Sequence, residues 1–105
     1  MYFRCDITQK SQIDYVVQET IAQYGHIDIL VNNAGIPYVE NFFNISENSW
    51  KHILDVNITG AFLFTQAVAA HMKKRNYGKI INIASINSRA AVRCNTAYVT
   101  SKGAI

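Results

Sequence analysis

The stretch IDILVNNAG, residues 27–35, decides the kind of fold that this chain can adopt. Four of its first five residues are apolar, and it ends in two asparagines, an alanine and a glycine. A short apolar run closed by turn-forming residues is typical of a strand buried on both faces, as in a parallel sheet. We expect this strand from Ile27 to Val31. The stretch KIINIA, residues 79–84, predicts a second strand of the same kind.

A helix is expected before the first of these strands. Apolar side chains recur at nearly helical spacing over residues 13–24. Thr8 is the expected N-cap of this helix, and Gly25 is its expected C-cap. Residues 1–5 are expected to form the end of a further strand.

A longer helix is expected between the two strands, from Glu47 to Lys74, with Ser46 as its N-cap. Its apolar residues cover more than one face, so a sheet alone cannot bury them all, and we expect a partner subunit against it. After the second strand, residues 85–94 are expected to form a polar loop. A last helix is expected to begin near Asn95 or Thr96.

The resulting order is strand, helix, strand, helix, strand, helix. Such alternation requires crossover connections and predicts an α/β fold, a doubly wound parallel sheet with helices on both faces. With 105 residues the chain is long enough for one small domain, which we expect to span residues 1–105.

The composition excludes several classes of protein. Half of the residues are hydrophobic and 16% are charged, which is typical of a globular chain. Cys5, Cys94 and the three histidines show no ligand spacing, so we expect neither a disulfide framework nor a metal site. Reduced thiols of this kind are usual in the cytoplasm, where we expect the protein to reside.

Nucleic-acid and membrane partners are not expected. The net charge of +3 is a mild excess, and the basic cluster at residues 73–75 suits the C-terminal end of a helix. A weaker alternative is a basic nucleic-acid binder. The most apolar stretch, residues 61–70, is too short to span a membrane, and the first residues show no signal-peptide pattern.

Tyr98 and Lys102 form the first candidate for chemistry. Residues four apart share one face of a helix, so their side chains are expected to lie side by side. A nearby cation favours the phenolate, which suits a tyrosine to proton transfer near neutral pH. Taken alone, such a pair is more often a surface tyrosine and a solvated lysine.

Three further features gain meaning beside this pair. Ser85 follows the second strand at the sheet edge where ligands bind, although a serine in such a loop more often caps its own turn. Asn57 is a polar residue within an apolar helix, where it either makes a structural hydrogen bond or marks a backbone distortion that holds a water. The sequence NNAG, residues 32–35, could be an ordinary turn or a close approach for a ligand.

In this order, these segments resemble the short-chain dehydrogenase/reductase family in its compact form. The resemblance runs along the chain through CDIT (5–8), NNAG (32–35), DVNITGAF (55–62), GKIINIAS (78–85) and YVTSKGAI (98–105). It implies the central part of a Rossmann-like fold and a soluble oxidoreductase that uses NAD or NADP on a secondary alcohol or ketone. The general look is that of 3-oxoacyl-carrier-protein reductases and sugar dehydrogenases.

The resemblance implies four catalytic residues. Tyr98 would be the general acid in ketone reduction and the base in alcohol oxidation. Lys102 would favour the ionised form of Tyr98 and hydrogen-bond the nicotinamide ribose. Ser85 would polarise the substrate carbonyl, and Asn57 would hold a water that links Lys102 to solvent.

The resemblance also implies a cofactor-binding set. Asp6 would accept a hydrogen bond from the adenine amino group, with Ile7 beside the ring. Asn33, Ala34 and Gly35 would line the ribose side of the cofactor, and Tyr98 and Lys102 would complete the set. Homodimers or homotetramers built on the long helix are implied for the whole enzyme.

Some parts of the family pattern are absent. No spacing among the five glycines makes the G-x-x-x-G-x-G phosphate turn, and the family's first strands and later strands have no counterpart. We therefore expect a partial NAD(P)-binding domain, an internal piece of a longer enzyme that is inactive alone. The alternative is a non-catalytic interaction or truncated module derived from such an enzyme.

Overall fold

A computed structural model describes residues 1–105 of the chain. Its elements in chain order are α1 (Lys10–Tyr24), β1 (Ile29–Asn32), the 3-10 helix η1 (Phe42–Asn44), α2 (Glu47–Leu54), the π-helical turn η2 (Asp55–Thr59), α3 (Gly60–Arg75), β2 (Lys79–Asn82), the 3-10 helix η3 (Ile86–Ser88) and α4 (Thr96–Ala104). From α1 onward the helices and strands alternate as the sequence predicts, but the expected strand at residues 1–5 is absent.

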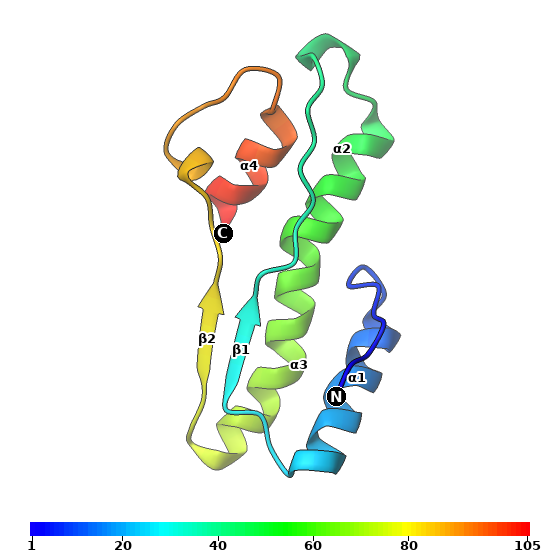
Figure 1. Ribbon diagram of the computed structural model, residues 1–105, viewed down its shortest axis with the longest axis vertical. Helices are drawn as coiled ribbons and strands as arrows, with labels where there is room; N and C mark the ends of the chain where they lie inside the picture. The colour runs from blue at the N-terminus through cyan, green and yellow to red at the C-terminus, as the bar shows by residue number, and fades with distance from the viewer.

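The two strands pair in parallel, as expected from their apolar character. The register runs from Ile29 opposite Lys79 to Asn32 opposite Asn82. Backbone bonds extend the pairing at both ends, because Lys79 N donates to Asp28 O at 2.8 Å and Ile83 N donates to Asn32 O at 3.0 Å. Both strands point toward α4, which lies beyond their carboxyl ends (Figure 1). The α/β class with a parallel sheet and flanking helices is confirmed.

One long helix connects the strands, as predicted. It runs for 29 residues from Glu47 to Arg75 and consists of α2, η2 and α3. Ser46 is its N-cap, because the Ser46 hydroxyl accepts a hydrogen bond from Ser49 N at 3.0 Å. Figure 1 shows it running the length of the molecule beside the sheet, with α1 against its lower half.

This helix is long and apolar enough to cross a membrane by length and composition, with a mean hydropathy of 1.4 in its most apolar window. The most apolar stretch of the sequence, residues 61–70, was expected to be too short to span a membrane. The helix that contains it is longer than that stretch. A core helix of a soluble protein meets the same criterion. Here the helix contacts β1 and contributes Val68 and Met72 to a core shared with α1, and 22% of its most apolar window is buried within residues 1–105.

The core lies between α1 and α3. Ile13 and Val17 of α1 pack with Val68 and Met72 of α3, and all four side chains are at most 7% exposed. The strands are less buried than expected: Ile29, Val31, Ile80 and Ile81 are between 39% and 57% exposed. The predicted burial of both strands on both faces is therefore wrong for these 105 residues, because α1 packs on α3 instead of covering the other face of the sheet.

The ends of α1 show one correct and one wrong cap. Gly25 is the C-cap in the left-handed conformation with φ 82°, and its N–H donates to Ile21 O. Thr8 is not the N-cap; Gln9 occupies that position without a side-chain hydrogen bond. The Thr8 hydroxyl instead donates to Asp6 Oδ1 at 2.8 Å. Residues 1–5 form no strand, because no neighbouring strand pairs with them.

Gly60 allows the loop at Ile7 to approach the long helix closely. A Cβ at Gly60 would lie 2.8 Å from the Ile7 side chain and 3.1 Å from Ile7 O. We expect Gly60→Ala to lower the free energy of unfolding, because overpacking costs about 1–3 kcal/mol and outweighs the helix preference for alanine of about 1 kcal/mol. Gly103→Ala in α4 is the matched control, since a Cβ there meets nothing within 4 Å. Urea unfolding followed by circular dichroism measures both variants, and an equal response would contradict the packing argument.

Candidate active site

The candidate site lies where the carboxyl ends of the strands meet α4. Lys102 of α4 is only 6% exposed, and its ammonium donates to Ile83 O, just past β2, at 2.8 Å. The same nitrogen lies 5.9 Å from the centre of the Tyr98 ring. The expectation of a phenol beside an ammonium is confirmed, and the alternative of a solvated lysine is excluded by this burial.

Asn57 lies in the π-helical turn and is 2% exposed. Its Oδ1 accepts from Ile36 N at 2.8 Å, and its Nδ2 donates to Ile36 O at 3.1 Å and to Ser101 Oγ at 2.9 Å. The structural hydrogen bonds of one alternative and the backbone distortion of the other are both present, and the water expected at the distortion stays a prediction. Single π-helical turns of this kind are frequent at functional sites.

Ser85 follows β2 and starts the loop that leads to α4. Its Oγ accepts a hydrogen bond from Asn87 N at 3.2 Å, so it caps the short helix η3, as one alternative held. A hydroxyl can accept and donate at the same time. No hydrogen bond within the chain uses the Ser85 O–H, so it can still donate to a carbonyl oxygen.

Asn32, the last residue of β1, and Asn33, which follows it, have different contacts. Asn32 Nδ2 donates to Asn82 Oδ1 at 2.8 Å and to Thr65 Oγ1 at 2.9 Å, which ties the two strand ends to α3. The expectation that this motif links neighbouring strands is thus confirmed for Asn32. Asn33 and Ala34 instead line an open hollow together with apolar side chains, among them Ile7 and Phe64.

Gly35 lies beside Asn57 and Lys102. A Cβ on Gly35 would lie 3.4 Å from Asn57 Oδ1 and 3.5 Å from Lys102 Nζ. Both are ordinary van der Waals distances, so the absence of a side chain leaves a small open space beside the Lys102 ammonium.

Asp6 precedes Ile7 and lines a separate open hollow with Arg4, Cys5 and Gln12. The pKa of this exposed carboxyl lies below its usual value, mainly because Thr8 N donates to it at 2.9 Å and also because the Thr8 hydroxyl does. Partial desolvation opposes this change, and the nearby His52 adds to it. Asp6 is therefore an ionised acceptor at neutral pH, and the neighbouring Ile7 lines the same hollow as Asn33 and Ala34.

The neighbouring Cys5 is not a reactive thiol. Its pKa is raised by burial and, to a smaller degree, by the charge of Asp6. A raised pKa keeps the thiol protonated at neutral pH, and only the thiolate is nucleophilic.

Sequence reasoning missed three members of this site. Ser101 joins Asn57 to α4, and its signal was a small hydroxyl residue within YVTSK, next to Lys102. The backbone groups of Ile36 and Ile83 hold Asn57 and Lys102. Their apolar side chains give no sign of this role, so no sequence pattern could have found them.

Comparison with known proteins shows what this arrangement is similar to. A family model described as short chain dehydrogenase matches residues 1–105. The 5-keto-D-gluconate 5-reductase of Escherichia coli (strain K12) is 42% identical over 100 residues, which cover 95% of this chain and 39% of the relative.

Two solved structures have the same fold over nearly the whole chain. A gluconate 5-dehydrogenase from Burkholderia cenocepacia, solved with NADP and tartrate, superposes with a TM-score of 0.89 at 40% identity, covering 94% of this chain and 39% of that one. A NAD+-bound xylitol dehydrogenase gives 0.92 at 34% identity, with 97% and 40% covered. The chain thus spans about two fifths of the length of these proteins.

Proposed function

This chain belongs to the short-chain dehydrogenase family, and from that we propose that it forms the central, catalytic part of an NAD(P)-dependent oxidoreductase. The enzyme interconverts a secondary alcohol and a ketone. The observation that carries the proposal is the buried Lys102 ammonium, which lies near the Tyr98 ring and donates to Ile83 O, two residues before Ser85 in the chain. A buried cation beside a phenol at a ligand-binding sheet edge suits general acid and base catalysis.

In ketone reduction, we assign the polarising contact to Ser85, whose O–H donates to the carbonyl oxygen. Bound NAD(P)H supplies the hydride that reaches the carbonyl carbon. Tyr98 gives its phenolic proton to the oxygen, so that the carbonyl becomes an alcohol and the phenolate remains beside the Lys102 ammonium. Alcohol oxidation is the reverse, with Tyr98 as the base.

We also propose that Asn57 supports the return of a proton to this pair through a water. Both amide hydrogens of its side chain are used by Ile36 O and Ser101 Oγ, and its Oδ1 accepts from Ile36 N. The water therefore binds the backbone of the π-helical turn, where the i to i−4 hydrogen-bond pattern is interrupted.

The cofactor is held along the carboxyl edge of the sheet. We assign the adenosine end to Asp6 and Ile7, the ribose side to Asn33, Ala34 and Gly35, and the nicotinamide ribose to Lys102 and Tyr98. The acceptor at Asp6 and the free space at Gly35 support this assignment.

The test uses a complete enzyme of this family that contains residues 1–105, such as a chimera in which they replace the matching segment of the Burkholderia cenocepacia gluconate 5-dehydrogenase. We call this the complete enzyme. NAD(P)H absorbance followed with a panel of ketones and secondary alcohols should show turnover with at least one pair. A folded complete enzyme that binds NAD(P)H and turns over none of them would contradict the proposal.

Residues 1–105 expressed alone should show no turnover. No glycine-rich turn within them holds a pyrophosphate, and positioning of reactants can contribute about 7–11 kcal/mol to lowering a barrier. The open edge of β1 and its exposed Ile29 and Val31 also favour association. NAD(P)H absorbance and circular dichroism on the isolated chain check both points; measurable turnover with cooperative unfolding would contradict this expectation.

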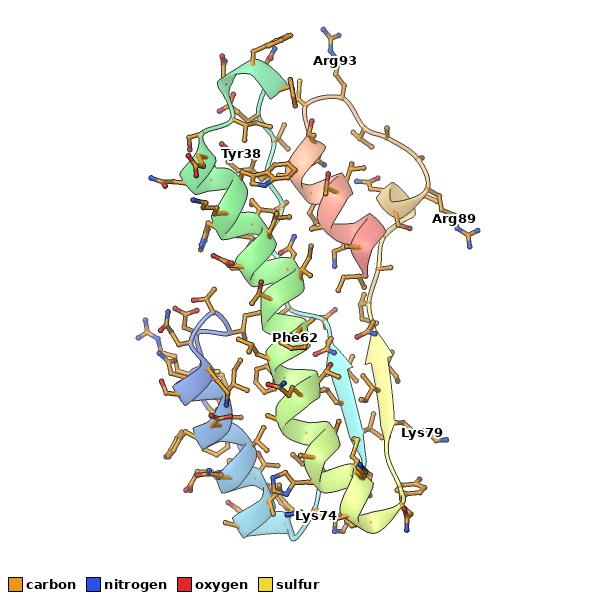
Figure 2. The ribbon with its side chains drawn as sticks, turned by 180° about the vertical axis from the view of Figure 1, so that it is seen from behind. Tyr38, Phe62, Lys74, Lys79, Arg89 and Arg93 are labelled. Carbon is orange, nitrogen blue, oxygen red and sulfur yellow. The ribbon has the colours of Figure 1, made fainter.

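We further propose that the complete enzyme is a homodimer or homotetramer joined along the long helix. Phe62 lies midway along this helix and is 58% exposed (Figure 2). Two-fold packing of one surface on its copy is the commonest way to cover such side chains. Phe62→Glu should shift light scattering toward the monomer, whereas Phe43→Glu, at a 91% exposed position outside this helix, should not. A complete enzyme that is already monomeric would contradict the proposal.

A further inference from the structure

We infer that Ser101 is a positioning residue that fixes the first turn of α4, and with it Tyr98, against the π-helical turn at Asn57. The inference rests on the proposed function in taking Tyr98 as the acid and base. Ser101 itself does not reach the reacting atoms; it acts through the backbone of Tyr98.

The Ser101 hydroxyl is fully buried and fully used. Its residue is 0% exposed. Its Oγ accepts from Asn57 Nδ2 at 2.9 Å and donates to Tyr98 O at 2.7 Å. This pair of bonds joins the backbone of the proposed acid to the side chain of a residue 44 positions earlier in the chain.

No other side chain can take over this function. Within residues 1–105, the bond between Ser101 and Asn57 is the only side-chain hydrogen bond that links α4 to the long helix. The other bond from an α4 side chain to another part of the chain is that of Lys102 to Ile83 O. Ser101 thus attaches α4 to the helix, and Lys102 attaches it to the strand end.

The first turn of α4 needs such an attachment because its N-terminus is not capped. Asn95 occupies the N-cap position and makes no side-chain hydrogen bond there. Substituting an N-cap typically weakens the start of a helix, and α4 has only nine residues. Tyr98 lies in this first turn, so its position depends on the contact that Ser101 makes from the second turn.

The attachment reaches beyond α4. Asn57 binds both the N–H and the carbonyl of Ile36, which follows Gly35. Ser101, Asn57 and Ile36 therefore connect the turn after β1, the π-helical turn and the helix of Tyr98 in one network. Loss of the Ser101 hydroxyl leaves an amide hydrogen of Asn57 without its acceptor in a buried site, so the network must rearrange.

The test compares Ser101→Ala with Thr100→Ala in the complete enzyme. Thr100 is the matched control, because it is the neighbouring exposed hydroxyl residue on the same helix. Ser101→Ala should lower kcat about 10- to 100-fold and leave the KM values for substrate and cofactor within threefold. Ser101→Thr, which keeps the hydroxyl, should restore most of kcat. Thr100→Ala should match the parent.

Amide hydrogen exchange provides a readout that does not depend on turnover. Residues 96–99 should exchange at least tenfold faster in Ser101→Ala than in Thr100→Ala. Unchanged exchange in this turn, or kcat within threefold of an active parent, would overturn the inference. An inactive parent with faster exchange in Ser101→Ala would contradict the proposed function and support the positioning role.

If Ser101→Ala does not fold, Ser101→Cys provides the test, because it keeps a similar volume with a weaker hydrogen-bonding group. Unchanged kcat and exchange in that variant would overturn the inference.

Discussion

Tyr98→Phe in the complete enzyme is expected to lower kcat about 10²–10⁴-fold, the contribution that general acid and base catalysis usually makes. The substitution removes only the phenolic oxygen. The ring that the Lys102 ammonium faces at 5.9 Å stays in place, so the fold and the cofactor affinity should be kept. Steady-state NAD(P)H kinetics and cofactor titration by calorimetry measure the two quantities separately.

Tyr77→Phe is the matched control for this prediction. Tyr77 lies at the opposite end of the molecule, between α3 and β2, and is 55% exposed, so the loss of its hydroxyl should leave kcat unchanged. A Tyr98→Phe enzyme that works within threefold of its parent would show that another group moves the proton.

Lys102→Ala is expected to lower both kcat and the affinity for the cofactor. The loss of kcat should be at least as large as for Tyr98→Phe, because the positive charge beside the phenolate that proton transfer leaves is removed. The cofactor should also bind about 10- to 100-fold more weakly, because a hydrogen bond to a charged group contributes about 1.5–3 kcal/mol. The same kinetics and calorimetry measure both changes.

Two variants separate this effect from simple loss of charge or of stability. Lys79→Ala removes an exposed lysine at the start of β2 and should leave both quantities unchanged (Figure 2). Lys102→Arg keeps a positive charge, but a planar guanidinium cannot occupy the space of an ammonium that Ile83 O holds at 2.8 Å, so it should rescue little. Full cofactor affinity in Lys102→Ala would contradict the proposed contact with the ribose.

The sequence by itself predicted what depends on neighbouring residues in the chain. Both strands, the long helix and the caps at Ser46 and Gly25 were found close to their predicted places, because periodicity and capping are local properties. The family was also evident, since its motifs occur in the expected order and the family model matches residues 1–105. The predicted roles of Asn57, Ser85, Tyr98 and Lys102 stay predictions that the variants above test.

Only the tertiary structure decided how these motifs contact one another. The acceptor of Lys102 is the backbone of Ile83, and the partner of Asn57 is the backbone of Ile36, neither of which a side-chain pattern can reveal. The same holds for the role of Ser101, which exists because α4 packs on the π-helical turn. The predicted cap at Thr8 failed because its hydroxyl donates to the carboxylate of Asp6. The predicted strand at residues 1–5 failed for a different reason, because a strand needs a paired neighbour that local sequence does not specify.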